Sequence, residues 1–245
     1  MRIIFLGTAT GIPQRNNYPS SIYVESNESK IVFDFGEGLI KSLVERNIDI
    51  NDIDAVFLTH FHVDHVAGIV PLLFAFRYEG NPRKKTFYII GPKGTVNFLK
   101  KLFRIFKGQI EPKGYELIIK ELGTYKFINF KGIKIKTFKT NHKKESIGYI
   151  IYLGKKRICY TGDTGYDRNY KKILRKVDIL ITECSLPIDV KNHLNPQKLL
   201  RLIEDIKPSE TYLVHIYPVM RKNMIIKYLK NKKIFIPKKY YEISI

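Results

Sequence analysis

The stretch Thr59-His60-Phe61-His62-Val63-Asp64-His65 indicates both the fold and the chemistry of this chain. It contains four side chains that bind metals, and it directly follows the apolar run 55–58, which is typical of a buried strand. His60 and His62 can point to one side of an extended turn, and Asp64 and His65 follow where that turn winds into a helix. Because imidazole and carboxylate groups suit zinc, iron and manganese, we interpret the stretch as half of a metal site.

The chain has three further histidines, His142, His193 and His215, which stand in polar loops or at the ends of apolar runs. Each one alone is more typical of a structural or surface histidine, but together they lie where a metal site can recruit them. Asp163 adds an anion within Gly162-Asp163-Thr164-Gly165, where flanking glycines allow sharp turns and close approach of the backbone. A carboxylate there can bridge two cations, although an ordinary turn aspartate is the alternative.

Strand and helix patterns alternate in both halves of the chain, and the centre is rich in strands. Strands are predicted at 31–35, 55–58, 87–90, 211–214 and 234–236, several more over 115–161, and helices at 39–46, 65–78, 95–107, 168–176, 196–206 and 221–230. This order predicts an α/β sandwich of sheets with helices on both outer faces. No linker or low-complexity tract interrupts the 245 residues, so we expect a single domain over 1–245.

Composition excludes several classes of protein. Hydrophobic residues make up 44% of the chain, which is enough for a full core. The two cysteines cannot form a disulfide framework. The apolar run near the N-terminus is too short for a signal peptide or a membrane span, so we expect a cytoplasmic protein with no membrane partner.

The net charge of +20 is concentrated in two segments. Segment 81–144 holds 17 basic and 3 acidic residues, and segment 220–240 holds 8 basic residues and no acidic one. Such a field attracts polyanions, and RNA bound through 81–144 and 220–240 is the partner we expect. An anionic membrane surface or a merely lysine-rich composition would also account for the charge.

The order His-x-His-x-Asp-His, a distant histidine, Gly-Asp-Thr and a late histidine resembles the metallo-β-lactamase superfamily, from Gly7 to about Pro218. The resemblance implies a four-layer αββα sandwich with a metal site at one rim of its two sheets. It also implies two divalent metal ions, with zinc expected first and manganese or iron as alternatives. The residues that it assigns are His60, His62 and His142 to one ion, Asp64, His65 and His215 to the other, Asp163 to both, and Asp34 to orienting a ligand histidine.

Within the superfamily, the sequence is similar to the tRNA 3′-processing endonucleases, the tRNase Z branch. The segments that carry this similarity are Leu6-Gly7-Thr8, Asp34-Phe35-Gly36-Glu37-Gly38 and Gly91-Pro92-Lys93-Gly94. The resemblance implies hydrolysis of a phosphodiester bond in RNA, at the 3′ end of tRNA, by a hydroxide that bridges the two metals. It implies that His193 protonates the leaving group with Glu183 as its acidic helper, and Asp64 is assigned to catalysis as well as to metal binding. By analogy, a homodimer is expected.

One departure from the branch bears on the substrate. The branch usually carries a projecting tRNA-binding arm between the residues that match His142 and Asp163, and only 20 residues separate them here. That length accommodates one hairpin, which favours a phosphodiesterase for small cyclic or alkyl phosphodiesters as the alternative. A lactone or thioester hydrolase of the same fold is a further alternative, and a non-enzymatic, basic RNA-binding protein is the one that the complete ligand set least favours.

Overall fold

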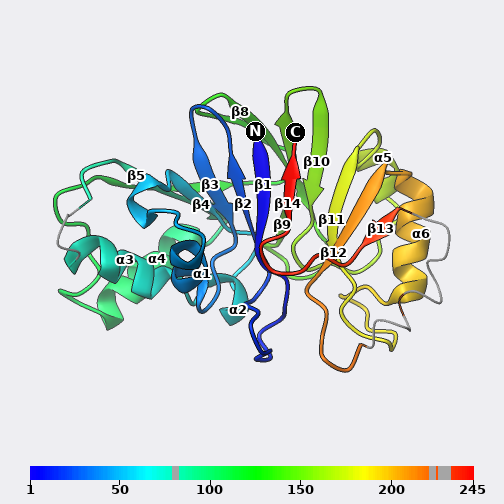
Figure 1. Cartoon of the computed structure of the whole chain (residues 1–245), viewed down its shortest axis with the longest axis horizontal. Helices are drawn as coiled ribbons and strands as arrows, with labels where there is room; N and C mark the ends of the chain where they lie inside the picture. Colours follow the sequence, from blue (N-terminus) through cyan, green and yellow to red (C-terminus); the bar gives the residue numbers. More distant parts are fainter. Residues whose placement is uncertain (79–82, 221–224, 226–232) are drawn as a thin grey trace.

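The computed structural model describes residues 1–78, 83–220, 225 and 233–245. Its strands form two seven-stranded sheets that face each other, and helices cover the outer face of each sheet (Figure 1). The predicted αββα layering is therefore confirmed. Among the described helices, none combines the length and the apolar character that crossing a membrane requires.

The first sheet contains the N-terminal strands and has the order β14-β1-β2-β3-β4-β5-β6. Its strands are β1 (Arg2–Gly7), β2 (Ser21–Glu25), β3 (Lys30–Phe33), β4 (Ala55–Phe57), β5 (Phe87–Pro92), β6 (Leu117–Leu122) and β14 (Glu242–Ser244). From β3 to β6 the strands are parallel, and β1 pairs antiparallel with both β2 and β14. The C-terminal strand β14 thus closes an edge of the N-terminal sheet.

The second sheet has the order β13-β12-β11-β10-β9-β8-β7. Its strands are β7 (Phe127–Phe130), β8 (Ile133–Lys139), β9 (Ile147–Leu153), β10 (Lys156–Tyr160), β11 (Ile179–Glu183), β12 (Glu210–Val214) and β13 (Ile234–Phe235). Strands β7 to β10 form an antiparallel meander, and β10 to β13 are parallel. The central core lies between the two sheets, where the rings of Phe33 and Phe57 stack with their centroids 5.2 Å apart.

Helices α1 (Leu39–Glu45), α2 (Val63–Val66), α3 (Ile69–Tyr78) and α4 (Thr95–Ile105), with the short helix η1 (Ile50–Asp52), belong to the first sheet's side. Helices α5 (Tyr170–Ile173) and α6 (Pro196–Ile206) cover the second sheet (Figure 1). Each group buries its own apolar cluster against its sheet, so the molecule has three apolar layers around two sheets.

Several predicted elements differ from the structure, and β3 and α4 each end two residues before their predicted ends. The helix predicted over 65–78 is split into α2 and α3 at Gly68, because a Cβ at Gly68 would lie 2.2 Å from the carbonyl oxygen of Gly36. Pro71 lies in the first turn of α3, where no backbone N–H is needed. The helix predicted over 168–176 is only the four-residue α5, and β5 continues two residues beyond its predicted end. The helix predicted over 221–230 lies almost wholly outside the described residues.

The arrangement of the parallel strands determines where polar residues meet. Asp34 and His60 follow β3 and β4 in the first sheet, and Asp163 and His215 follow β10 and β12 in the second. Because the carboxyl ends of these strands lie at the same rim of the sandwich, residues from both halves of the chain are brought together there.

Candidate metal centre

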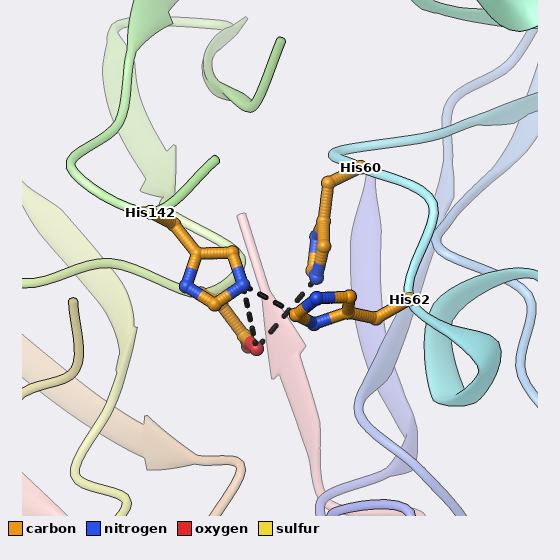
Figure 2. A group of neighbouring side chains, drawn as sticks. His60, His62 and His142 are labelled. Atoms are coloured by element: carbon orange, nitrogen blue, oxygen red, sulfur yellow. Dashed lines mark hydrogen bonds and ion pairs between the residues drawn. The ribbon is translucent and has the colours of Figure 1, made fainter. Parts of the chain in front are cut away.

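Six histidines and two aspartates, distant in the sequence, gather at this rim. His60, His62 and His142 point their rings toward one another and toward a carboxylate oxygen (Figure 2). Two groups of donor atoms, each with its atoms within 4.8 Å of one another, account for every residue that the sequence assigned to metal binding. The groups are His60, His62, His142 and Asp163, and then Asp64, His65 and His215.

The first group surrounds one oxygen of Asp163. The Nε2 atoms of His60 and His142 lie 3.7 and 3.8 Å from Asp163 Oδ2. His142 Nε2 lies 3.2 Å from Nδ1 of His62, whose ring completes the group. These four side chains come from both sheets, since His60 and His62 follow β4, His142 follows β8 and Asp163 follows β10.

The second group surrounds the other oxygen of the same carboxylate. The Nε2 atoms of His65 and His215 lie 3.3 and 3.4 Å from Asp163 Oδ1. Asp64 closes this group, with its Oδ2 atom 3.1 Å from His215 Nε2 and 3.9 Å from His65 Nε2. The two oxygens of Asp163 therefore face two different donor sets, which is the arrangement of a bridging ligand.

The donor atoms fit metal ions on two independent observations. Two ligands on a tetrahedral zinc, with bonds of about 2.1 Å, are separated by about 3.4 Å, close to the spacings within both groups. In addition, His60 Nε2, His65 Nε2 and Asp163 Oδ1 are buried atoms without a hydrogen-bond partner among the described residues. Buried polar atoms normally have hydrogen-bond partners, so these three atoms without partners fit a site that binds a cation.

Asp34 and Thr59 hold the rings of two of these histidines. Asp34 Oδ2 accepts a hydrogen bond of 2.8 Å from His65 Nδ1 and one of 2.9 Å from the hydroxyl of Tyr160. Thr59 donates its backbone N–H to Asp34 Oδ1, and its hydroxyl lies 2.9 Å from both Asp34 Oδ2 and His60 Nδ1. Asp34 therefore orients His65 directly and His60 through Thr59, and the Nε2 atoms of both rings are left for a metal.

The other two Nε2 donors are oriented in the same way. His142 Nδ1 lies 3.1 Å from the carbonyl oxygen of Asn192, and His215 Nδ1 lies 3.0 Å from the hydroxyl of Ser185. A carbonyl accepts only from an N–H, so His142 carries its proton on Nδ1 and its Nε2 lone pair faces the cluster. The cluster is therefore preorganised by bonds on the far sides of its rings.

The environment lowers the pKa values of both carboxylates, and it shifts the pKa values of the histidines differently in the two groups. Burial lowers the pKa of His60 well below its ordinary value, and nearby His65 lowers it further. For Asp163 burial acts to raise the pKa, but His215 and His65 hold it well below the usual range. For Asp64 burial also acts to raise the pKa, but the hydrogen bond with His215 and the charges of His65 and His215 together lower it to about 2. Burial acts to lower the pKa of His65 and His215, but Asp163 and the other carboxylates beside them raise it, so these two rings release a proton when a cation binds.

Glu183 and His193 form a pair beside the cluster. The carboxylate of Glu183 is fully buried and lies 3.0 Å from His193 Nδ1, and it accepts hydrogen bonds from the backbone N–H of Thr164 and Leu194. Burial acts to lower the pKa of His193, but the bond to Glu183 raises it above its ordinary value. The ring of His193 lies 4.9 Å from that of His142, so its Nε2 side is close to the metal donors.

The backbone brings the loops together where side chains would collide. Gly162, with φ of +58°, precedes Asp163, and a Cβ there would lie 2.7 Å from the Thr59 side chain. The loop after β1 also reaches the cluster, because the N–H of Gly11 donates to Asp64 Oδ2 at 3.0 Å. Asp34 has φ of +58°, a strained conformation that asparagine and aspartate tolerate better than most residues.

Four residues in contact with the site had no role in the sequence analysis: Thr59, Tyr160, Ser185 and Tyr217. Ser185 donates its hydroxyl to Glu183 and faces His215, so it joins the Glu183–His193 pair to a metal ligand. Nothing in the local sequence indicates this contact, because β11 and β12 bring its members together from 30 residues apart. The cluster itself contains every metal-binding residue that the sequence predicted.

Comparison with known proteins agrees with this fold. The sequence profile of the family described as anti-Pycsar protein Apyc1 matches residues 1–236. Ribonuclease Z of Methanosarcina mazei is 34% identical over 151 residues, which is 62% of this chain and 48% of that protein. The chain spans about half the length of the first curated relatives that it matches.

Two solved structures share the fold along their whole length. The metallo-β-lactamase fold protein YhfI from Bacillus subtilis has a TM-score of 0.86 and 22% identity, with 99% of this chain and 98% of that chain covered. Human tRNase Z, short form, has a TM-score of 0.80 and 20% identity, with 100% and 99% covered. These structures confirm the predicted metallo-β-lactamase fold, and the relatives named Ribonuclease Z are similar to the chain as the sequence predicted. The chain therefore belongs to the family described as anti-Pycsar protein Apyc1, and it has the metallo-β-lactamase fold.

Proposed function

We propose that this protein is a two-metal phosphodiesterase and that its first substrate class is small phosphodiesters, cyclic or alkyl. The observation that carries the proposal is the division of donors around Asp163, whose two oxygens face two separate ligand sets. His60, His62 and His142 would hold one ion, Asp64, His65 and His215 the other, and Asp163 both. Zinc is the ion we expect first, with manganese or iron as alternatives, because imidazole and carboxylate donors accept all three.

When bound, a pair of divalent cations lowers the pKa of a water to near neutrality and neutralises charge on the phosphoryl oxygens. The protein's part is to keep the donors in place, which it does through Asp34, Thr59 and Ser185. We also assign Asp64 a part in catalysis, since its side chain is 13% exposed whereas that of Asp163 is 2% exposed. Asp64 is therefore the carboxylate of the cluster that a substrate can approach.

His193 is the general acid in this proposal. An alkoxide leaving group needs a proton, and Glu183 keeps the proton on His193 by raising the pKa of its imidazole. Glu183 itself is buried and does not reach the substrate, so it positions His193 and favours its charged form. This pair supports phosphodiester hydrolysis over thioester hydrolysis, because a thiolate leaves without a proton more readily than an alkoxide does.

The size of the substrate is inferred from the connection between His142 and Asp163. That connection consists of β9 and β10, paired from Lys156–Leu153 to Tyr160–Tyr149, and the two-residue turn between them. No arm projects from this part of the described chain. A site without an arm supports a substrate that is held at the metal centre itself.

RNA is the second candidate substrate, with the 3′ end of tRNA as the cleaved position. Two observations support it: the relatives named Ribonuclease Z, and the exposed basic face of α4, which carries Lys100, Lys101 and Arg104. Helix α4 adjoins the site, since its Phe98 stacks on Phe61 at 5.2 Å. Most of segment 220–240 lies outside the described residues. The homodimer, the single domain and the cytoplasmic location stay predictions.

Parallel assays on the metal-loaded protein test the proposal. Bis(4-nitrophenyl) phosphate, a nucleoside 3′,5′-cyclic monophosphate and a precursor tRNA with a 3′ trailer are each incubated with zinc or manganese, and His65→Ala serves as the control. Hydrolysis of the small phosphodiesters by the wild type alone is the expected result. Cleavage of the tRNA at its 3′ end, with the small substrates untouched, would transfer the assignment to RNA. If His65→Ala retains the hydrolytic activities of the wild type, the assignment of the metal ligands is refuted.

A further inference from the structure

The loop between β1 and β2, residues 8–20, extends beyond the rim of the sandwich that carries the metal centre, and Figure 1 shows it in dark blue. Its tip is open to solvent, since Gly11, Ile12 and Pro13 are exposed. Its two ends are fixed in the fold, where Thr8 and Ser20 are buried. We call this segment the β1–β2 loop, and its contacts with the metal centre are made from both its base and its tip.

Hydrogen bonds within the β1–β2 loop fix its shape. The backbone N–H of Ala9 donates to the carbonyl oxygen of Tyr18 at 2.9 Å. The side chain of Asn17 accepts the backbone N–H of Thr8 at 3.1 Å and that of Tyr18 at 3.0 Å, and its Nδ2 atom donates to Thr8 Oγ1 at 3.0 Å. Because one amide side chain makes all three bonds, Asn17 holds Thr8 in a single position.

The β1–β2 loop binds two ligands of the second donor group directly. The carbonyl oxygen of Thr8 accepts the backbone N–H of His215 at 2.9 Å. The N–H of Gly11 donates to Asp64 Oδ2 at 3.0 Å, and a Cβ at Gly11 would lie 3.1 Å from the Cβ of Asp64. The backbone of the loop therefore packs on one ligand and hydrogen-bonds to both.

His215 depends on this support because of its backbone conformation. Its φ of +53° lies in the left-handed region, which residues other than glycine adopt only where neighbouring groups hold them there. The loop holds the chain on both sides of this residue, since Thr8 binds the N–H of His215 and Gln14 Nε2 donates to the carbonyl oxygen of Ile216 at 3.1 Å. Asn17 and Gln14 thus act on the direction of the His215 ring through the backbone.

The first donor group has different supports. His142 is held through the carbonyl oxygen of Asn192, and His60 through the hydroxyl of Thr59. Within the described ranges of the chain, no hydrogen bond joins the β1–β2 loop to His60, His62 or His142. The supports of the two groups are therefore separate, although Asp163 belongs to both.

From this geometry we infer that Asn17 and Gln14 are positioning residues for the second metal ion, and that the β1–β2 loop sets the affinity of that ion independently of the first. The inference rests on the two-metal site of the proposed function and adds a separate control of one of its halves. Without Asn17 and Gln14, the carbonyl of Thr8 and the turn at His215 are no longer fixed, and the donors Asp64 and His215 lose their alignment.

Zinc affinity, measured by competition with a chromogenic chelator, tests the inference in two backgrounds. His142→Ala leaves only the second donor group complete, and Asp64→Ala leaves only the first. In each background and in the wild type, Gln14→Ala/Asn17→Ala is compared with its parent, and Asn17→Asp keeps the oxygen that accepts the two N–H groups. Asn129→Ala, at an exposed position of β7, is the control for loss of an amide. Thermal unfolding of each metal-free protein verifies that it is folded.

Gln14→Ala/Asn17→Ala should weaken zinc binding at least tenfold in the His142→Ala background and less than twofold in the Asp64→Ala background. In the wild type it should weaken one of two zinc-binding steps and spare the other. Asn17→Asp should stay within threefold of its parent, and Asn129→Ala within twofold.

Equal losses at both donor groups, or a loss of less than tenfold at the second, would overturn the inference. A wild type that binds two zinc ions, with neither step selectively weakened in Gln14→Ala/Asn17→Ala, would refute the role of the loop and leave the proposed function standing. A wild type that binds no zinc would refute the proposed function and the role of the loop together.

Discussion

Replacing Asp34 by asparagine would remove one buried charge from the bonds that orient the metal ligands while leaving the shape of the side chain almost unchanged. Asp34 is fully buried, and its φ of +58° is a conformation that asparagine also tolerates. Its carboxylate accepts from four donors: the N–H and hydroxyl of Thr59, Nδ1 of His65 and the hydroxyl of Tyr160. The variant therefore tests the hydrogen bonds and not the packing.

The directions of these hydrogen bonds determine how much stability and metal affinity the Asp34→Asn variant should lose. If the new amide nitrogen replaces Oδ2, His65 must accept from it and carry its proton on Nε2, where a metal would bind. If the nitrogen replaces Oδ1, it faces the backbone N–H of Thr59. Each orientation leaves an unmatched buried donor or blocks a ligand, so the free energy of unfolding should fall by about 1–3 kcal/mol. Metal affinity should fall by about 10–100-fold, as is typical when a partner of a ligand histidine is lost.

Two measurements check the Asp34→Asn prediction. Competition with a chromogenic chelator gives the affinity for zinc, and urea unfolding of the metal-free protein gives the stability. Asp52→Asn is the matched control, because Asp52 lies at the exposed helix η1 and pairs with Lys30 at the surface. A zinc affinity within twofold of the wild type, in a protein that retains its fold, would refute the role assigned to Asp34.

Four further results are expected. His193→Ala should lower kcat by about 100-fold or more, while the zinc content, measured by metal analysis of the same samples, stays at the wild-type level. An equal loss of kcat and of zinc content would make His193 a ligand instead. In Glu183→Gln, the pKa of His193 should fall, because Glu183 raises it. The alkaline limb of the pH–activity profile should therefore shift to lower pH, and an unchanged limb would contradict the pairing of Glu183 with His193. Chelation should lower the Tm of the wild type, because zinc at about 100 times its Kd adds about 2.7 kcal/mol to the free energy of unfolding. In His65→Ala, chelation should shift the Tm much less. Ser185→Ala should weaken zinc binding, whereas Ser42→Ala, which removes a buried bond to the carbonyl oxygen of Leu6, should not.

Local signals in the sequence predicted helix α6 with its observed bounds. The side chain of Asn195 accepts from the N–H of Lys198, and Pro196 occupies the first turn, where a missing N–H costs nothing. The segment 168–176 lacks such a start, because Asn169 makes no capping bond through its side chain, and only the four residues of α5 are helical. Element positions were thus predictable where caps and amphipathic spacing agreed.

The split between α2 and α3 was not predictable from periodicity. Gly68 breaks the helix because its N–H donates to the carbonyl oxygen of Phe35 and its Cα packs on Gly36, two residues that are distant in the sequence. The sequence pattern from 65 to 78 does not indicate that contact.

The sequence by itself determined the ligand types, the strand ends at which they stand and the αββα layering. Short segments of the sequence indicate each of these features: the donors cluster as His-x-His-x-Asp-His, apolar runs end in polar residues, and helical and strand periodicities alternate. Only the tertiary structure decided how the donors divide around Asp163 and which bonds fix the ring of His215 through Ser185. The physical reason is that these relations join side chains from different strands, and the register and twist that bring such strands together depend on packing across the whole sandwich.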